Sequence, residues 1–196
     1  RSRARFVEEA RVGARIRSDH VVEVMAAGVD PATGIPWLAM ELLEGHDLEG
    51  VVQRRGALPP AEVLDILAQV GHALGAAHAL GIIHRDLKPE NLFVAEKRQR
   101  GATAIVKILD FGIARMVEGN RTAATVTSAI GSPLWMAPEQ AQPGAKLRPA
   151  TDVWALGLIA FYLLTGKSYW RAANHPEFNL SALLVEAMTH PIEPPS

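Results

Sequence analysis

Cysteine is absent from this chain of 196 residues. Its absence excludes disulfide bonds, thiolate catalysis and cysteine–zinc sites, and it fits a reducing cytosol. The formal net charge is only −1, so no overall basic field attracts nucleic acid or acidic membrane surfaces. We therefore expect no nucleic-acid partner.

Long hydrophobic runs are scarce as well. The most apolar run, "VWALGLIAFYLLTG" from Val153 to Gly166, is shorter than the roughly 20 residues that cross a bilayer, and it predicts a buried helix. The first residues, "RSRARFVEEA", are basic without a following apolar core, unlike a signal peptide. Apolar residues nevertheless make up 48% of the chain, which favours a globular protein.

The hydrophobic pattern predicts a small part with strands, followed by a mostly helical part. Residues 3–17 have the pattern of an amphipathic helix, and "HVVEVMAAGV" and "PWLAMELL" read as an antiparallel pair around the turn "DPATG". Proline at the start and Gly81 at the end frame a long helix from Pro59 to Leu80. "NLFV" and "AIVKILDF" predict two short strands, and residues 152–165 and 179–188 predict two more helices. The fold class is therefore α+β, with two lobes.

Polar residues interrupt this pattern in "GIIHRDLKPENLFV". Asp86, Lys88 and Asn91 lie on a short loop that leads into a strand, and the next strand, "VKILDFG", ends at Asp110. Carboxylate and amide oxygens suit Mg²⁺, which shares its ligands with substrate phosphates, and a lysine suits a phosphate as a point charge. These residues predict a site for a metal–polyphosphate complex.

The ordered motifs "HRDLKPEN", "DFG", "APE" and "DVWALG" resemble the signature set of eukaryotic-type protein kinases, across essentially the whole chain. Lysine in "DLKPEN" resembles the serine/threonine branch, and the alanine- and arginine-rich style resembles bacterial members. The resemblance implies a two-lobed kinase fold, with residues 1–43 as a remnant of the N-lobe and residues 44–196 as an incomplete C-lobe. The hinge between the lobes would be "LLEGHDL".

The same resemblance implies roles for the polar residues. Asp86 would accept the proton of a substrate hydroxyl or orient that hydroxyl, and Lys88 would stabilise charge on the transferring γ-phosphoryl group of ATP. Asn91 and Asp110 would hold Mg²⁺, with Mn²⁺ as an alternative. His84 and Phe111 would support the site without acting in it.

Further residues would bind the rest of ATP. Glu9 resembles the helix glutamate that pairs with a phosphate-binding lysine, although a solvated helix charge is the other interpretation. Met40 resembles the gatekeeper of the adenine pocket, and Glu41 C=O and Leu43 N–H would bind adenine. Asp47 would reach the ribose, or it would instead cap the helix that begins at Leu48.

"RTAATVTSAIGSPLWMAPEQ" resembles an activation segment. Arg85 beside Asp86 implies control by a phosphate on this segment, and the sequence does not choose among Thr122, Thr125, Thr127 and Ser128. Three more positions would dock substrate or support the site: Ser132, Glu139, whose usual partner is an arginine further along the chain, and Asp152, which would anchor the catalytic loop. Self-association for autophosphorylation is a further expectation.

Two parts of the family pattern do not occur in this sequence. One is the glycine-rich loop with the strand lysine that precede Glu9, and the other is the set of helices that would complete the large lobe and carry the arginine partner of Glu139. We therefore expect an active serine/threonine kinase in the longer parent protein and little or no phosphate transfer by these 196 residues alone. Two other functions stay open, a regulatory pseudokinase or scaffold and a small-molecule phosphotransferase, but Arg85 and "MAPEQ" favour a protein substrate. The expected location is the cytoplasm, with membrane anchoring of the parent left open.

Overall fold

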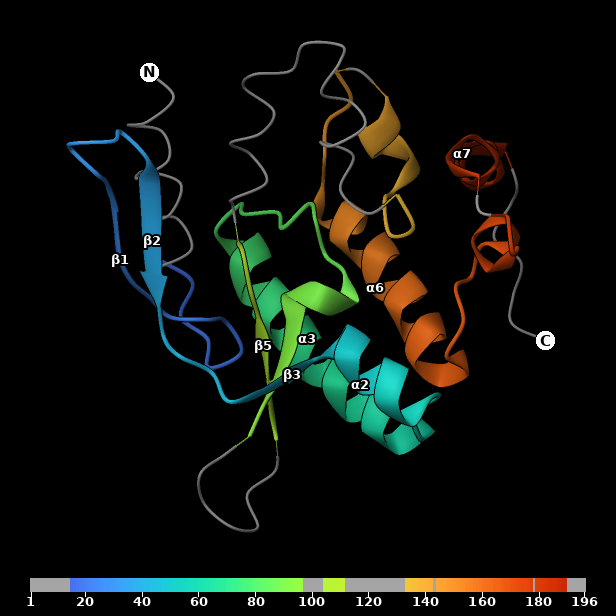
Figure 1. The fold of residues 1–196 in the computed structure, drawn as a ribbon, viewed down its shortest axis with the longest axis horizontal. Coiled ribbons are helices and arrows are strands. Elements are labelled where there is room, and N and C mark those ends of the chain that lie inside the picture. The colour runs from blue at the N-terminus through green and yellow to red at the C-terminus, as the bar shows by residue number, and fades with distance from the viewer. Residues whose placement is uncertain (1–14, 97–103, 112–132, 143, 178, 190–196) are drawn as a thin grey trace.

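The structure is a computed structural model that describes residues 15–96, 104–111, 133–142, 144–177 and 179–189. Strands β1 (Val24–Val29) and β2 (Pro36–Met40) form a two-stranded antiparallel sheet to one side of the helices (Figure 1). Asp30 stabilises the turn between them, because its carboxylate accepts hydrogen bonds from the N–H groups of Ala32 and Thr33, both at 2.8 Å. The predicted antiparallel pair is confirmed.

A second sheet lies against the helices. Its strands are β3 (Gly45–Asp47), β4 (Leu92–Ala95) and β5 (Ile105–Ile108), arranged antiparallel in that order. Val21 adds a parallel bridge to Ile108, so the segment before β1 is attached to the edge of this sheet. Part of the expected hinge segment is therefore strand β3, because its backbone pairs with β4.

Four α-helices lie within the described residues. They are α2 (Leu48–Arg55), α3 (Pro60–Ala79), α6 (Pro149–Thr165) and α7 (Leu180–Thr189), and α3 packs against α6 (Figure 1). Fully buried Ile159 and Leu163, four residues apart on one face of α6, join Val70 and Leu74 of α3 in the core. The apolar run from Val153 to Gly166, which predicted a buried helix, thus supplies most of α6 and part of the core.

The structure corrects the sequence-based boundaries at several places. Residues 15–17 lie outside any helix, so the expected N-terminal helix does not reach Arg17, and residues 1–14 lie outside the described part. A local turn follows these residues, in which the Ser18 hydroxyl accepts from the N–H of His20 at 3.2 Å. Helix α6 begins three residues earlier than expected, at Pro149, and three short 3₁₀ helices were not predicted: η1 (Pro89–Asn91), η3 (Pro138–Ala141) and η4 (Arg171–Asn174).

None of the helices within the described ranges combines the length and apolar character needed to span a membrane.

Candidate active site

Asp152 of α6 binds the backbone of the loop that carries the polar residues. This aspartate is 1% exposed, and its carboxylate accepts hydrogen bonds from the backbone N–H groups of His84 and Arg85, each at 2.9 Å. The His78 ring, at the end of α3, lies 2.7 Å from the same carboxylate. A buried carboxylate needs such partners, so this arrangement holds α3, α6 and the loop together. These contacts are those expected of a residue that anchors the loop, and the anchoring role of Asp152 stays a prediction.

His84 supports the loop from its buried position. The Asp86 N–H donates to His84 Nδ1 at 3.3 Å, so that nitrogen is an acceptor, and Nε2–H donates to Leu109 C=O at 2.8 Å. The imidazole also packs edge-on against the Phe111 ring, with the ring centroids 4.8 Å apart. Both side chains thus connect the loop to the end of β5, in agreement with the structural roles expected of them.

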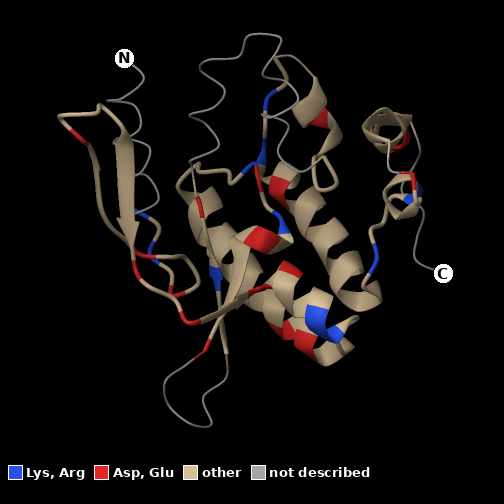
Figure 2. Ribbon diagram, viewed as in Figure 1, with Lys and Arg blue, Asp and Glu red and all other residues tan. Residues whose placement is uncertain are grey.

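Asp86, Lys88 and Asn91 come together on this loop and on the short helix η1. Figure 2 shows acidic and basic segments of the chain, red and blue, close together near the middle of the view. Lys88 Nζ lies 3.9 Å from Asp86 Oδ2, and Asn91 Nδ2 donates to the Asp86 carbonyl at 2.8 Å. The side chains of Asp86 and Lys88 are 32% and 24% exposed, so solvent and ligands can reach them. A carboxylate and an ammonium therefore converge on one accessible point.

Asp110 lies at the end of the neighbouring strand. The Leu109 N–H donates to Asn91 C=O at 2.9 Å, which brings the residue after β5 to the start of β4. Asp110 itself has a φ of 59°, a left-handed conformation that few non-glycine residues adopt and that is frequent at functional sites.

The oxygen atoms of Asn91 and Asp110 fit a hard divalent cation. Because Asn91 Nδ2 is engaged by Asp86, the amide oxygen is the atom left to act as a ligand. Among the described residues there is no cluster of three or more His, Cys, Asp or Glu side chains that could hold a metal ion. A two-residue set of this kind suits a divalent cation that takes its remaining ligands from water and phosphates.

The residues expected around adenine lie on the connection from β2 to β3. Met40 ends β2 and is 38% exposed, and Leu43 follows in the irregular segment. Asp47 caps α2, because its carboxylate accepts from the Gly50 N–H at 2.6 Å, which confirms one of the two interpretations of this residue. Its contact with a ribose stays a prediction.

The side chain of Glu41 has a role that the sequence did not suggest. Its carboxylate accepts from Lys107 Nζ of β5 at 2.5 Å and from the Glu23 N–H at 2.8 Å. Burial raises the pKa of Glu41, but the hydrogen bonds and the charge of Lys107 outweigh burial and leave that pKa below its ordinary value. The segment from Met40 to Leu43 is thereby tied to the strand that leads to Asp110.

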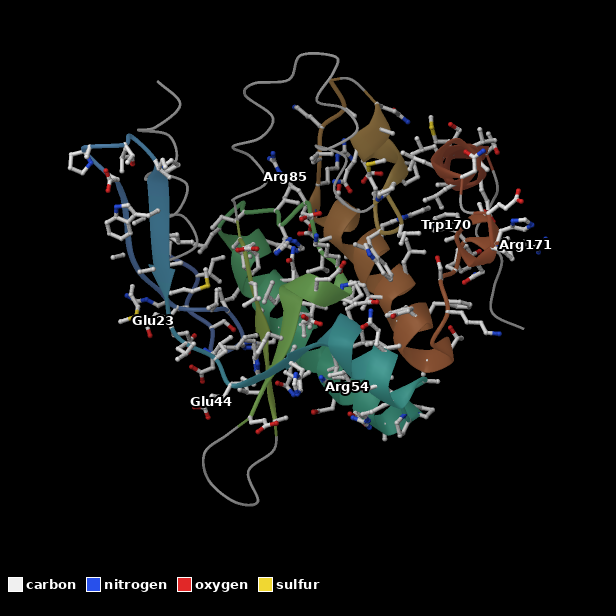
Figure 3. All side chains as sticks on the ribbon, in the orientation of Figure 1. Glu23, Glu44, Arg54, Arg85, Trp170 and Arg171 are labelled. Atoms are coloured by element: carbon white, nitrogen blue, oxygen red, sulfur yellow. The ribbon has the colours of Figure 1, made fainter. Side chains whose placement is uncertain are left out.

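The later residues of the expected activation segment pack on α6 and on the region before α7. The Trp170 indole N–H donates to Leu134 C=O at 2.8 Å, and Trp135 packs edge-on against Tyr162, with the ring centroids 5.6 Å apart. Trp170 lies beside α7 in Figure 3.

Burial raises the pKa of the Tyr162 hydroxyl, and the nearby carboxylates of Glu49 and Glu90 raise it further.

Glu139 has a partner that the sequence did not suggest. Its carboxylate accepts from the Thr151 hydroxyl at 2.7 Å, and Thr151 is 1% exposed on the first turn of α6. The same hydroxyl accepts from the Arg148 N–H at 3.2 Å. Neither Thr151 nor His78 had been singled out from the sequence, because nothing in their neighbourhood distinguishes them from ordinary helix residues.

Several predicted site residues lie outside the described part of the chain. They are Glu9, Thr122, Thr125, Thr127, Ser128 and Ser132.

Comparisons with known proteins identify the family of the chain. Residues 1–192 match the protein kinase domain family. The serine/threonine-protein kinase Pkn1 of Myxococcus xanthus is 37% identical over 191 residues, which is 97% of this chain and 25% of Pkn1. The serine/threonine-protein kinase PknA of Mycobacterium tuberculosis is 37% identical over 197 residues, 97% of this chain and 41% of PknA.

Solved structures give the same result for the fold. A crystal structure of a singly mutated PknI kinase domain from Mycobacterium tuberculosis has a TM-score of 0.65 and 30% identity, covering 84% of this chain and 58% of that one. The chain belongs to the protein kinase family and resembles its bacterial serine/threonine members, and the α+β fold is that of a kinase domain. It spans well under half the length of either curated relative.

Proposed function

We propose that the protein containing this chain is a serine/threonine protein kinase, which transfers the γ-phosphoryl group of ATP to hydroxyl groups of proteins. The observation that carries the proposal is the convergence of Asp86, Lys88 and Asn91 on a loop held by buried Asp152. Since phosphoryl transfer depends almost entirely on positioning and electrostatics, a rigidly held set of these residue types is what the reaction requires.

Each side chain has a definite task in this proposal. Asp86 orients the substrate hydroxyl and accepts its proton as the new O–P bond forms. Lys88, 3.9 Å away, contacts the phosphoryl oxygens that gain charge. Asn91 Oδ1 and the Asp110 carboxylate hold the divalent cation, which when bound neutralises charge on the phosphates. Mg²⁺ is the proposed ion, with Mn²⁺ as a substitute.

For ATP we propose that adenine lies beside Met40 and binds Glu41 C=O and Leu43 N–H. The hydrogen bonds of the Glu41 side chain support this, because they fix the backbone that would present both groups. The connection around residue 43 would then be the boundary between an N-lobe of residues 1–43 and a C-lobe of residues 44–196. Glu9 would pair with the phosphate-binding lysine of the N-lobe.

We further propose that protein substrates dock against the segment Pro133–Ala137 and that phosphorylation regulates the protein. Arg85 would pair with a phosphate on Thr122, Thr125, Thr127 or Ser128, and self-association would allow one copy to modify another. Ser132 would contact the catalytic residues. The packing of Leu134 and Trp135 on Trp170 and Tyr162 supports a formed docking segment.

The test is transfer of labelled phosphate from ATP by the full-length protein with Mg²⁺, to itself and to a generic serine/threonine protein substrate. We expect transfer by the wild type and its loss, by about 10²–10⁴-fold, in Asp86→Asn. Asp65→Asn, the same change at an exposed position of α3, is the matched control and should transfer normally. A folded wild type that binds ATP without transferring phosphate would instead indicate a regulatory pseudokinase.

A further inference from the structure

The peptide unit between Arg85 and Asp86 is held at both of its polar atoms. Its carbonyl, on Arg85, accepts a hydrogen bond from Gln140 Nε2 at 2.7 Å, and its N–H, on Asp86, donates to His84 Nδ1 at 3.3 Å. Arg85 has a φ of 72°, a left-handed conformation that costs energy for a residue with a side chain. Such a conformation persists only where its surroundings hold it, so these two hydrogen bonds, with the Asp152 contact to Arg85 N–H, are a means of holding it.

Gln140 uses both ends of its amide. Its Oε1 accepts from the Ala137 N–H at 3.0 Å while its Nε2 donates to the Arg85 carbonyl. The partners determine which end is which, because a backbone carbonyl can only accept and a backbone N–H can only donate. The amide therefore bridges the segment Pro133–Ala137 and the loop that carries Asp86. Arg85, the residue on that loop whose carbonyl accepts the hydrogen bond, is labelled in Figure 3.

Only one of the two hydrogen bonds has a local explanation. Ala137 is the N-cap residue of η3 and Gln140 is its third residue, so the bond to the Ala137 N–H is the ordinary return bond of a helix cap. The bond to Arg85 joins residues 55 positions apart and does nothing for η3. Its effect falls on the peptide that directly precedes the Asp86 side chain.

We propose that Gln140 is a positioning residue for phosphoryl transfer, which links the segment Pro133–Ala137 to the Arg85–Asp86 peptide and so fixes the Asp86 carboxylate. This inference rests on the proposed kinase function. Rotation of that peptide would displace the carboxylate, and displacements of about 1 Å at a reacting centre are costly. The residues proposed to bind adenine, Met40 to Leu43, make none of these contacts, so the effect falls on kcat and spares the KM for ATP.

Two substitutions test the two hydrogen bonds of the Gln140 amide separately. Gln140→Glu keeps an acceptor for the Ala137 N–H but faces the Arg85 carbonyl with an oxygen, whereas Gln140→Lys keeps a donor for that carbonyl and loses the acceptor. Gln142→Glu is the matched control, because it makes the same change at an exposed position two residues further on. The measurement is kcat and KM for ATP with a peptide substrate, in the full-length protein.

We expect a kcat about tenfold lower in Gln140→Glu at an unchanged KM for ATP, largely restored activity in Gln140→Lys, and wild-type values in Gln142→Glu. Wild-type kcat in Gln140→Glu, or an equal loss in Gln140→Lys, would overturn the inference and leave Gln140 as a helix cap. If Gln140→Glu does not fold, Gln140→Lys is compared with Gln140→Met, and equal kcat values overturn the inference. Absence of transfer by the wild type would overturn the proposed function itself.

Discussion

The carboxylate of Asp152 lies 2.9 Å from the backbone nitrogen of Arg85, although 67 residues separate the two in the sequence. This contact places the residue before the proposed catalytic Asp86 directly on α6, the most apolar of the described helices. The core of the protein and the geometry of the candidate active site therefore depend on the same side chain.

Replacement of Asp152 should destabilise the domain as well as impair transfer. In Asp152→Asn an NH₂ group replaces one of the oxygens that now accept from His84 and Arg85, so a buried donor loses its acceptor. We expect the free energy of unfolding to fall by about 2–3 kcal/mol, measured by urea denaturation. Exposed Asp65→Asn should change it by less than about 0.5 kcal/mol, and equal effects of the two substitutions would contradict the anchoring role.

Substitution of Lys88 should affect the chemical step without affecting the fold. Lys88 is partly exposed and contacts Asp86 at 3.9 Å, so Lys88→Met removes a charge from the site but little packing. We expect kcat to fall by about 10²–10³-fold while the melting temperature changes little. The exposed Lys167→Met is the control, and a large loss of stability in Lys88→Met would point to a structural role instead.

The hydroxyl of Thr151 should contribute more to the free energy of unfolding than its methyl group does. Thr151→Val keeps the shape of the side chain but leaves the Glu139 carboxylate and the Arg148 N–H without their partner. We expect a loss of about 1–2 kcal/mol in the free energy of unfolding, and a smaller loss in Thr151→Ser, which retains the hydroxyl. Equal losses in the two variants would show that the hydrogen bonds contribute little.

Glu41 should make stability depend on pH in the acidic range. Because its pKa in the folded protein is lowered, its carboxylate contributes stability above the ordinary glutamate pKa of about 4.3, and that stability is lost as the pH falls through the folded pKa. The stability difference between the wild type and Glu41→Gln should therefore shrink as the solution is acidified. Exposed Glu177→Gln is the control, and a difference that does not change with pH would contradict the prediction.

Much of the fold could be predicted because local patterns are strong in this chain. The turn residues between β1 and β2, the prolines that start α3 and the apolar run of α6 each act over a few positions. Strand β3 could not be predicted in the same way, because "GHD" has no strand pattern and becomes a strand only through its pairing with β4.

The residues of the candidate site also fall into two groups, those that a local sequence pattern predicts and those that it does not. Asp86, Lys88 and Asn91 were predicted from one short stretch, since they lie on a single loop. Gln140, Lys107 and Thr151 were not predicted, because their partners are distant in the sequence and a lone polar residue carries no sign of its partner.

The order of the amino acids supplies the chemistry available to this protein, namely oxygen ligands, an ammonium group and a carboxylate in ordered motifs, together with the apolar stretches that form its core. How those groups are held follows from contacts between distant segments of the folded chain. Asp152 reaches the catalytic loop and Gln140 reaches the Arg85 carbonyl through contacts between segments that the folded core brings together. Burial makes such hydrogen bonds obligatory, and burial is a property of the folded chain.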